Sequence, residues 1–248
     1  MSHQEKEKKP LFFVYGLIAY AIGVTGLMGI IFAMAGLVPL GLGAEVGNAF
    51  PSVLINVFLV GLFAVQHTIM ARPRFKEWVG KVIDPAVERS HFVLGAGLIP
   101  ILFISFWQPI DGVVWSVFND FPVIRWLPFV AGWAYLFAST FAINHWDLFG
   151  LRQTWLAARG VAYQKLVFKE NWMYRYSRHP IMLGALMGFC LVPEMSVNQA
   201  LLAVLMSTYV FVGIRFEERD LLREFGDSYQ KYRDRVGMFV SLPRNKSH

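Results

Sequence analysis

Long apolar stretches separated by short charged segments constrain this chain most strongly. Of its 248 residues, 56% are hydrophobic and 16% are charged, and the charges fall into a few blocks. The apolar stretches between the blocks are roughly 20 residues long, the length that a helix needs to cross a bilayer. Because only helices and closed barrels satisfy their backbone groups in lipid, the sequence predicts an all-α, polytopic integral membrane bundle.

Four apolar segments are long enough to be predicted as spanning helices: 11–38, 51–71, 91–107 and 123–143. A further apolar region, 180–214, is predicted to form a helical hairpin broken at Pro193-Glu194, with a short first arm. We expect one membrane domain over 1–248, divided into a four-helix portion, 1–143, and a portion facing the cytoplasm, 144–248. The first apolar run is too long for a typical signal peptide, so we expect it to remain as an anchor.

Lysine and arginine predict the orientation of these spans. Basic residues occur in four segments of the chain: 6–9, 72–89, 152–178 and 215–248. The loops 39–50, 108–122 and 193–197 contain none, and Arg125 is the exception to the pattern. The positive-inside rule therefore predicts that both termini are cytoplasmic. The same residues attract anionic lipid head groups, so the net charge of +6 does not indicate nucleic-acid binding. With Cys190 as the single cysteine, we expect neither an internal disulfide nor a metal site.

A split charged motif brackets the predicted hairpin. Arg178-His179-Pro180 precedes its first arm, and Glu217-Glu218 follows its second. Pro180 suits the first position of a helix, so His179 is predicted at the N-cap, where the helix dipole favours an anion. The two glutamates need hydrogen-bond donors or a cation. A ligand that carries both a carboxylate and cationic or hydroxyl groups, such as S-adenosylmethionine, fits this pair. Alternatively, the charges form a salt-bridged rim that holds the hairpin closed.

The C-terminal region also resembles a known signature. Its pattern is Arg178-His179-Pro180-x-x-x-Gly184, followed by Glu217-Glu218-x-x-Leu221-x-x-x-Phe225-Gly226-x-x-Tyr229-x-x-Tyr232-x-x-x-Val236. It resembles the isoprenylcysteine carboxyl methyltransferase and phospholipid methyltransferase superfamily over about 178–243. The resemblance implies that S-adenosylmethionine binds within a helical membrane fold at Arg178, His179, Pro180, Gly184, Glu217 and Glu218. We add Tyr176 as an aromatic neighbour of the cationic methyl group. One departure is Met182, where the family commonly has tyrosine.

Earlier motifs are most similar to the methanethiol S-methyltransferase branch of that superfamily. They are Gln66-His67, Met70-Ala71-Arg72-Pro73, Glu88-Arg89-Ser90 and Asn144–Gln153. This similarity implies an enzyme that methylates methanethiol to dimethyl sulfide at the cytoplasmic membrane face. Two alternatives stay open. One is a methyltransferase for a larger acceptor, either an isoprenylcysteine carboxylate or a phospholipid amine. The other is a non-catalytic membrane protein related to the family associated with nitrite and nitric oxide reduction, which shares some early motifs.

Methylation of a thiol requires its thiolate, so a base or a positive environment must be present near neutral pH. His67, His145, Asp147 and Arg152 are the candidate catalytic residues, and we expect them at the level of the split motif. A histidine oriented by a carboxylate has the properties of a general base. Alternatively, His67 pairs between helices and the segment around Asp147 caps the fourth span. Arg152 either pairs with Asp147 or extends toward lipid head groups.

Two further segments are predicted to be helical outside the spans. Leu148, Leu151, Trp155 and Leu156 recur at helical spacing, which indicates an amphipathic helix on the inner leaflet that could act as a lid. After the double glutamate, apolar residues again keep helical spacing, interrupted at Gly226, so the C-terminal tail is predicted to pack back on the cytoplasmic face. The oligomeric state does not follow from the sequence.

Overall fold

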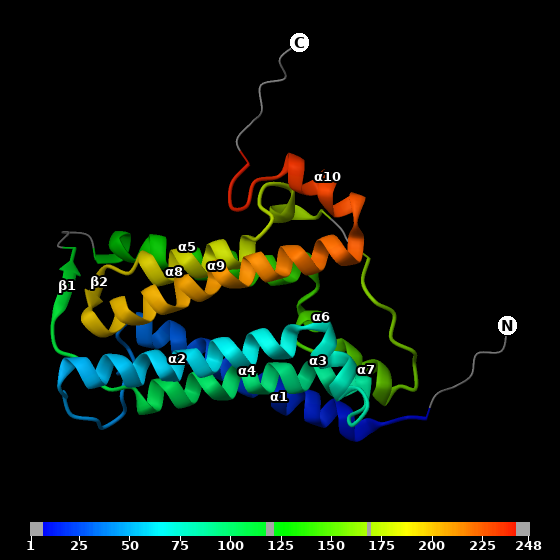
Figure 1. The fold of residues 1–248 in the computed structure, drawn as a ribbon, viewed down its shortest axis with the longest axis horizontal. Coiled ribbons are helices and arrows are strands. Elements are labelled where there is room, and N and C mark those ends of the chain that lie inside the picture. Colours follow the sequence, from blue (N-terminus) through cyan, green and yellow to red (C-terminus); the bar gives the residue numbers. More distant parts are fainter. Residues whose placement is uncertain (1–6, 118–121, 168–169, 242–248) are drawn as a thin grey trace, which may run out of the picture. The chain divides into compact units, whose positions relative to one another are not determined.

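The computed structural model describes residues 7–117, 122–167 and 170–241. Its helices are α1 (Pro10–Met34), α2 (Ala49–Ala71), α3 (Pro73–Val79), α4 (Pro85–Phe106), α5 (Pro122–Ile143), α6 (His145–Leu148), α7 (Leu151–Ala158), η1 (Trp172–Arg175), α8 (Pro180–Cys190), α9 (Val197–Phe225) and α10 (Asp227–Arg235) (Figure 1). Two short strands, β1 (Val113–Ser116) and β2 (Glu194–Ser196), complete the described elements. The all-α prediction is confirmed.

Five helices are long and apolar enough to cross a membrane: α1, α2, α4, α5 and α9. They correspond to the four predicted spans and the second arm of the predicted hairpin, so the chain is an integral membrane protein. The first arm, α8, has 11 residues and is therefore about 16 Å long, which is roughly half of the hydrocarbon thickness. The prediction of a short first arm is thus confirmed.

Two helix boundaries differ most from those expected. Helix α4 begins at Pro85 rather than near residue 91, because Asp84 caps it: its Oδ1 accepts a hydrogen bond from the amide of Ala86 at 2.9 Å. Helix α9 continues past the apolar segment to Phe225. Its 29 residues make it about 44 Å long, longer than the hydrocarbon core, so it carries charged residues beyond its apolar part.

The described residues belong to two compact units. The first contains residues 1–116, 144–166 and 194–205, and the second contains 117–143, 167–193 and 206–248. In the first unit, α1 and α4 cross closely at Gly26 and Gly97. The contact is so close that a Cβ on either residue would collide with the backbone of the opposing helix. The side chain of Thr154 of α7 lies against Gly16 of α1, where an added Cβ would collide with it. Small residues therefore set the helix crossings, as is common in membranes.

The loops predicted to lie away from the cytoplasm meet within the first unit. Strands β1 and β2 pair antiparallel and so connect the loops 108–122 and 193–197. Asn198 accepts hydrogen bonds from the indole of Trp107 at 3.0 Å and from the amide of Ile110 at 2.9 Å. The amide of Gly47, in the loop before α2, donates to the carbonyl of Pro109. The described parts of these loops that belong to the first unit thus contact one another, and the sequence did not predict the strands that connect two of them.

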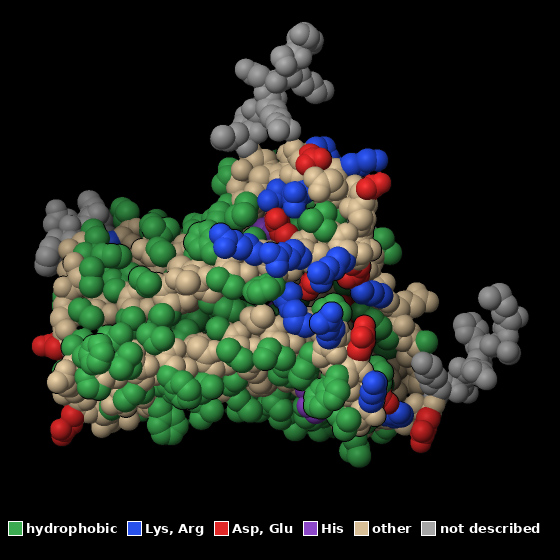
Figure 2. All heavy atoms as spheres, in the orientation of Figure 1, with side chains coloured by type: hydrophobic (Ala, Val, Ile, Leu, Met, Phe, Trp, Pro, Cys, Tyr) green, Lys and Arg blue, Asp and Glu red, His purple; other side chains and the backbone are tan. Residues whose placement is uncertain are grey.

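In the second unit, α5 and α8 pack through glycines. A Cβ on Gly184 would lie 2.6 Å from the amide nitrogen of Leu136, and Gly188 lies against the ring of Trp133. Helix α9 is followed by α10 after Gly226, whose φ is +52°, so the predicted interruption at Gly226 is confirmed. Apolar side chains cover the long helices, whereas charged side chains gather on α10 and the adjoining end of α9 (Figure 2).

Candidate functional site

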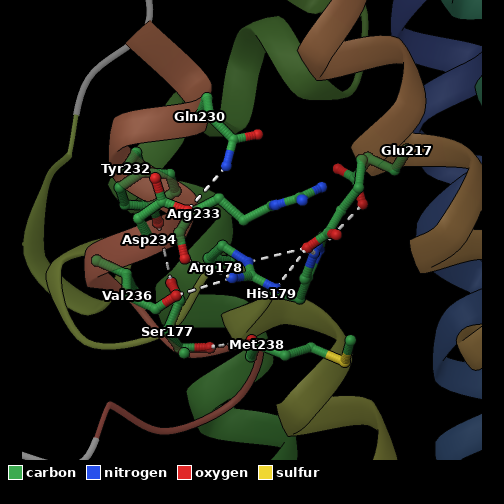
Figure 3. A network of polar contacts seen from close by, with 12 residues as sticks. Ser177, Arg178, His179, Glu217, Gln230, Tyr232, Arg233, Asp234, Val236 and Met238 are labelled. Carbon is green, nitrogen blue, oxygen red and sulfur yellow. Dashed lines mark hydrogen bonds and ion pairs between the residues drawn. The ribbon is translucent and has the colours of Figure 1, made fainter. Parts of the chain in front are cut away.

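Arg178 and Glu218 form the centre of the split motif. Arg178 lies two residues before α8, and Glu218 lies on α9. The Nε and Nη2 atoms of Arg178 each lie 2.8 Å from the same carboxylate oxygen of Glu218. Figure 3 shows Arg178 beside His179, with Glu217 close to them. Both side chains are largely buried, 11% and 15% exposed. The salt bridge that one interpretation of the sequence predicted is therefore present between Arg178 and Glu218.

His179 lies between the two glutamates. It is the N-cap of α8, with Pro180 at the first helical position, as predicted. Its Nε2 lies 3.1 Å from Glu218 Oε1, and its Nδ1 lies 3.2 Å from Glu217 Oε2. Ionised carboxylates only accept hydrogen bonds, so both contacts are satisfied when the imidazole carries two protons.

The pKa of His179 reflects this environment. Burial by itself would lower the pKa, but hydrogen bonds and charge from Glu217 and Glu218 outweigh burial and raise it. When His179 is protonated, its charge and that of Arg178 balance the charges of the two carboxylates, and the cluster is neutral. Such pairing offsets the cost of placing four charged groups close to an apolar helix pair.

The C-terminal segment binds the backbone and side chain of this motif. Arg178 Nη1 donates to the carbonyls of Arg233 and Val236, both at 2.9 Å. The amides of Arg178 and His179 donate to the carbonyls of Gly237 and Met238. The C-terminal segment thus packs back on the chain, as predicted, through these contacts around Arg178.

Tyr232 of α10 strengthens the same attachment. Its hydroxyl donates to the carbonyl of Tyr174 at 2.6 Å and lies 3.3 Å from that of Ser177. Its side chain is 2% exposed and packs with Tyr229 and Val236. This small apolar cluster on α10 therefore fixes the loop that presents Arg178 and His179.

The glutamates differ in accessibility. Glu217 is 46% exposed and Glu218 is 15% exposed. A carboxylate has about four acceptor positions, and Glu217 uses one of them on His179. Glu217 therefore keeps unused acceptor positions, whereas Glu218 is contacted by both Arg178 and His179. Both glutamates lie about two turns before the end of α9, rather than at its end as expected, so the helix dipole acts on them only weakly.

Two other residues of the motif have different surroundings. Gly184 faces α5, which explains why a side chain is absent there. The side chain of Tyr176 is 68% exposed, and its carbonyl accepts hydrogen bonds from the amide and hydroxyl of Ser241. Their contribution to cofactor binding stays a prediction.

The candidate catalytic residues lie in the first unit. His145 is 4% exposed, and its Nε2 lies 2.9 Å from the hydroxyl of Tyr20 on α1. Burial lowers the pKa of His145, so the imidazole is neutral near neutral pH. Phe149 contacts the same ring, with 4.6 Å between ring centroids. A neutral imidazole is the form of histidine that can act as a base.

Asp147 is paired with Arg152, as one of the two sequence interpretations proposed. Arg152 Nη1 lies 2.7 Å from Asp147 Oδ1, and the hydroxyl of Tyr163 donates to Oδ2 at 3.2 Å. The amide of Asp147 donates to Asn144, which caps α6. The structure thus brings Asp147, Arg152 and Tyr163 together.

His67 contacts aromatic rings between α2 and α4. Its ring centroid lies 5.3 Å from that of Phe63 and 4.7 Å from that of Phe92. Arg89 lies over the same Phe92 ring and donates to the carbonyl of Leu148. That His67, His145 and Asp147 converge with the Arg178 cluster stays a prediction.

The sequence interpretation missed several partners in these clusters. Tyr20 and Tyr163 lie in segments that carry no recognisable motif, and the carbonyls of Arg233 and Val236 have no sequence signal at all. The helical spacing of Tyr229 and Tyr232 did indicate that α10 has a buried face.

Comparisons with known proteins agree on the relatives of this chain. It is 39% identical to a methanethiol S-methyltransferase of Mycobacterium tuberculosis, across 95% of this chain and 98% of that protein. It is 40% identical to methanethiol S-methyltransferase 1 of Bradyrhizobium diazoefficiens, across 94% and 83% of the two chains. Bovine Nurim is more distant, at 26% identity across 66% of this chain and 65% of its own. No family model and no solved structure matches the chain.

Proposed function

The chain belongs to the methanethiol S-methyltransferase family, and from this premise we propose that it methylates methanethiol to dimethyl sulfide with S-adenosylmethionine as the donor. The chain is thus a membrane methyltransferase. The observation that carries the proposal is the near full-length similarity to these relatives, combined with the half-exposed Glu217 beside His179. We further propose that this cluster faces the cytoplasm.

The residues of the split motif fit such a donor. Glu217 offers acceptor positions for ribose hydroxyls or the ammonium group, and the exposed ring of Tyr176 suits the cationic methyl centre. Arg178 and Glu218 hold His179 and the α8 N-terminus in place. When bound, S-adenosylmethionine supplies a methyl group on a sulfonium, which is already a good leaving group. The chain therefore has to align the thiolate with that methyl and exclude water.

The acceptor must lose its proton before or during transfer. We assign His145 as the proton acceptor, because its buried imidazole is neutral and held by Tyr20. Asp147 and Arg152 stabilise the turn that carries it, since both lie on the α6–α7 segment and bind each other. His67 contributes to the aromatic wall between α2 and α4.

The test is formation of dimethyl sulfide by the purified protein in detergent. Methanethiol and S-adenosylmethionine are supplied together, and dimethyl sulfide is measured by headspace gas chromatography. Glu217→Gln should abolish product and donor binding, whereas Glu224→Gln, a change at an exposed carboxylate of the same helix, should preserve both. Donor binding without product from methanethiol would favour a larger acceptor. Absence of donor binding in the unmodified protein would favour the structural interpretation of the charged rim.

A further inference from the structure

Arg89 is an arginine of α4 that no step above uses. It lies in the first turns of a helix that is apolar enough to cross a membrane. A cation at such a position is costly unless it has a partner or a function. Within residues 7–117, 122–167 and 170–241, Arg89 forms one hydrogen bond, from Nε to the carbonyl of Leu148 at 2.6 Å, and no ion pair.

The guanidinium of Arg89 is held in place rather than free to extend toward head groups. Besides the bond to Leu148, its central carbon lies 4.5 Å from the centroid of the Phe92 ring. These two contacts hold the guanidinium against α4 and the α6 segment. A guanidinium has five N–H donors, and the four on the Nη atoms make no hydrogen bond to the part of the chain that the structure describes. Arg89 as a whole residue is intermediate between buried and exposed.

Charged and titratable groups lie around Arg89, but among the described residues none of them forms an ion pair with it. Asp147 and Tyr163 lie on the α6 side, Glu88 is adjacent on α4, and His67 is on α2. The carboxylate of Asp147, the natural counter-ion, already binds Arg152 and Tyr163. The site thus has a fixed cation with open donors.

The surroundings of this cation are apolar and aromatic. Phe92 lies under the guanidinium, and His67 and Phe63 follow on the same wall. A small anion with an apolar body suits such a place better than a hydrated phosphate, which has three or more oxygens to satisfy. Methanethiolate has one charged sulfur and one methyl group.

From this geometry we propose that Arg89 binds the thiolate form of the acceptor, its Nη donors facing the sulfur and Phe92, Phe63 and His67 facing the methyl group. The inference rests on the proposed function. In the reaction, the thiol proton goes to His145, a bond forms between the thiolate sulfur and the methyl carbon, and the sulfonium bond breaks with its electron pair returning to the donor's sulfur. Arg89 takes no proton and forms no bond; it stabilises the anion.

The direct test is a titration of the bound thiol without donor. Methanethiol is added to the donor-free protein, and the ultraviolet thiolate band is followed against pH. An opposite charge nearby lowers an acid's pKa by about 1 to 3 units, so the bound thiol should ionise below its pKa in water. Arg89→Met should remove that shift, and Arg89→Lys, which keeps the charge, should retain most of it.

A second arm uses activity and a matched control. At neutral pH, Arg89→Met should lower kcat/KM for methanethiol by about 10- to 1000-fold, because one pKa unit is a factor of ten, and the activity should recover as the pH is raised. Arg159→Met removes another cation, at the end of α7 in the same unit, and should leave the titration unchanged.

The outcomes separate this inference from the proposed function. Dimethyl sulfide production together with an unshifted thiolate titration in the unmodified protein would overturn the role of Arg89 and leave the proposed function standing. Loss of the pKa shift in Arg159→Met to the same extent as in Arg89→Met would also overturn it, because the effect would then come from the general positive charge of the unit. If size-exclusion chromatography shows that Arg89→Met does not fold, Arg89→Lys becomes the deciding variant. A folded Arg89→Lys protein in which the pKa shift of the bound thiol is lost would contradict a charge-based role.

Discussion

Arg178 directs two of its nitrogens at a single carboxylate oxygen of Glu218, each at 2.8 Å, although 40 residues separate the two positions in the chain. The pair joins the start of α8 to α9 and leaves the neighbouring Glu217 half exposed. We therefore propose different tasks for the adjacent glutamates: Glu218 holds the site together, and Glu217 binds the ligand.

Substitution of each glutamate should separate these tasks. Glu218→Gln leaves Arg178 and His179 without their shared buried carboxylate, so we expect the free energy of unfolding to fall by about 3 kcal/mol. Glu217→Gln removes one half-exposed contact and should cost under about 1 kcal/mol while abolishing donor binding. Thermal unfolding in detergent and equilibrium binding of S-adenosylmethionine measure the two effects. Equal loss of stability in both variants would contradict the division.

Stability should depend on pH through His179. Its pKa in the folded protein is raised, against the effect of burial, by Glu217 and Glu218. A group of this kind contributes fully below its unfolded pKa, about 6.5, and the contribution is lost as the pH rises through the raised folded pKa. We therefore expect Tm to fall as the pH rises from 6.5 into the alkaline range, and to fall less steeply in His179→Gln. A Tm that rises over that range in the unmodified protein alone would contradict a protonated His179.

Removal of the Tyr232 hydroxyl should weaken the attachment of the C-terminal segment. Tyr232→Phe keeps the buried ring but leaves the carbonyls of Tyr174 and Ser177 without this donor, which should cost about 1 to 2 kcal/mol. Because the same segment binds Arg178, we also expect KM for S-adenosylmethionine to rise more than kcat falls. Steady-state kinetics with varied donor checks this, and a change confined to kcat would argue against it.

Two glycines of the second unit offer a matched test of helix packing. A methyl group on Gly184 would meet the backbone of α5, at 2.6 Å from Leu136 N and 2.7 Å from Gly132 O. Gly184→Ala should therefore destabilise the protein by about 1 to 3 kcal/mol. At Gly213 on α9, nothing lies within 4 Å of the added Cβ, so Gly213→Ala should be neutral or slightly stabilising. An unchanged Tm in Gly184→Ala with lost donor binding would mean that Gly184 serves the cofactor rather than the packing.

The sequence predicted most of what depends on local pattern. Apolar length predicted the spans, Pro180 predicted the start of α8, and Gly226 predicted the break before α10. The charged pair of Arg178 and Glu218 was predicted as a cluster, because both belong to one spaced motif. Each of these features depends on residues that determine the backbone conformation or the polarity at their own position in the chain.

Features that depend on distant pairing were not predicted. Strand β1 is only four residues long and largely exposed, and its partner β2 lies far away in the sequence. The hydroxyl of Tyr20 contacts His145, which lies 125 positions later in the chain. Arg178 binds backbone carbonyls, and because every residue has a carbonyl, the sequence does not show which ones it binds. Such contacts leave no local pattern, because they result from the packing of whole helices.

The measurement that tests the central claim most directly is isotopic. The purified protein is incubated with methanethiol and S-adenosylmethionine that carries a trideuterated methyl group, and the dimethyl sulfide is analysed by mass spectrometry. The account predicts product with one deuterated and one ordinary methyl group, absent in Glu217→Gln. Dimethyl sulfide without deuterium, or no dimethyl sulfide from folded protein that binds the donor, would contradict it.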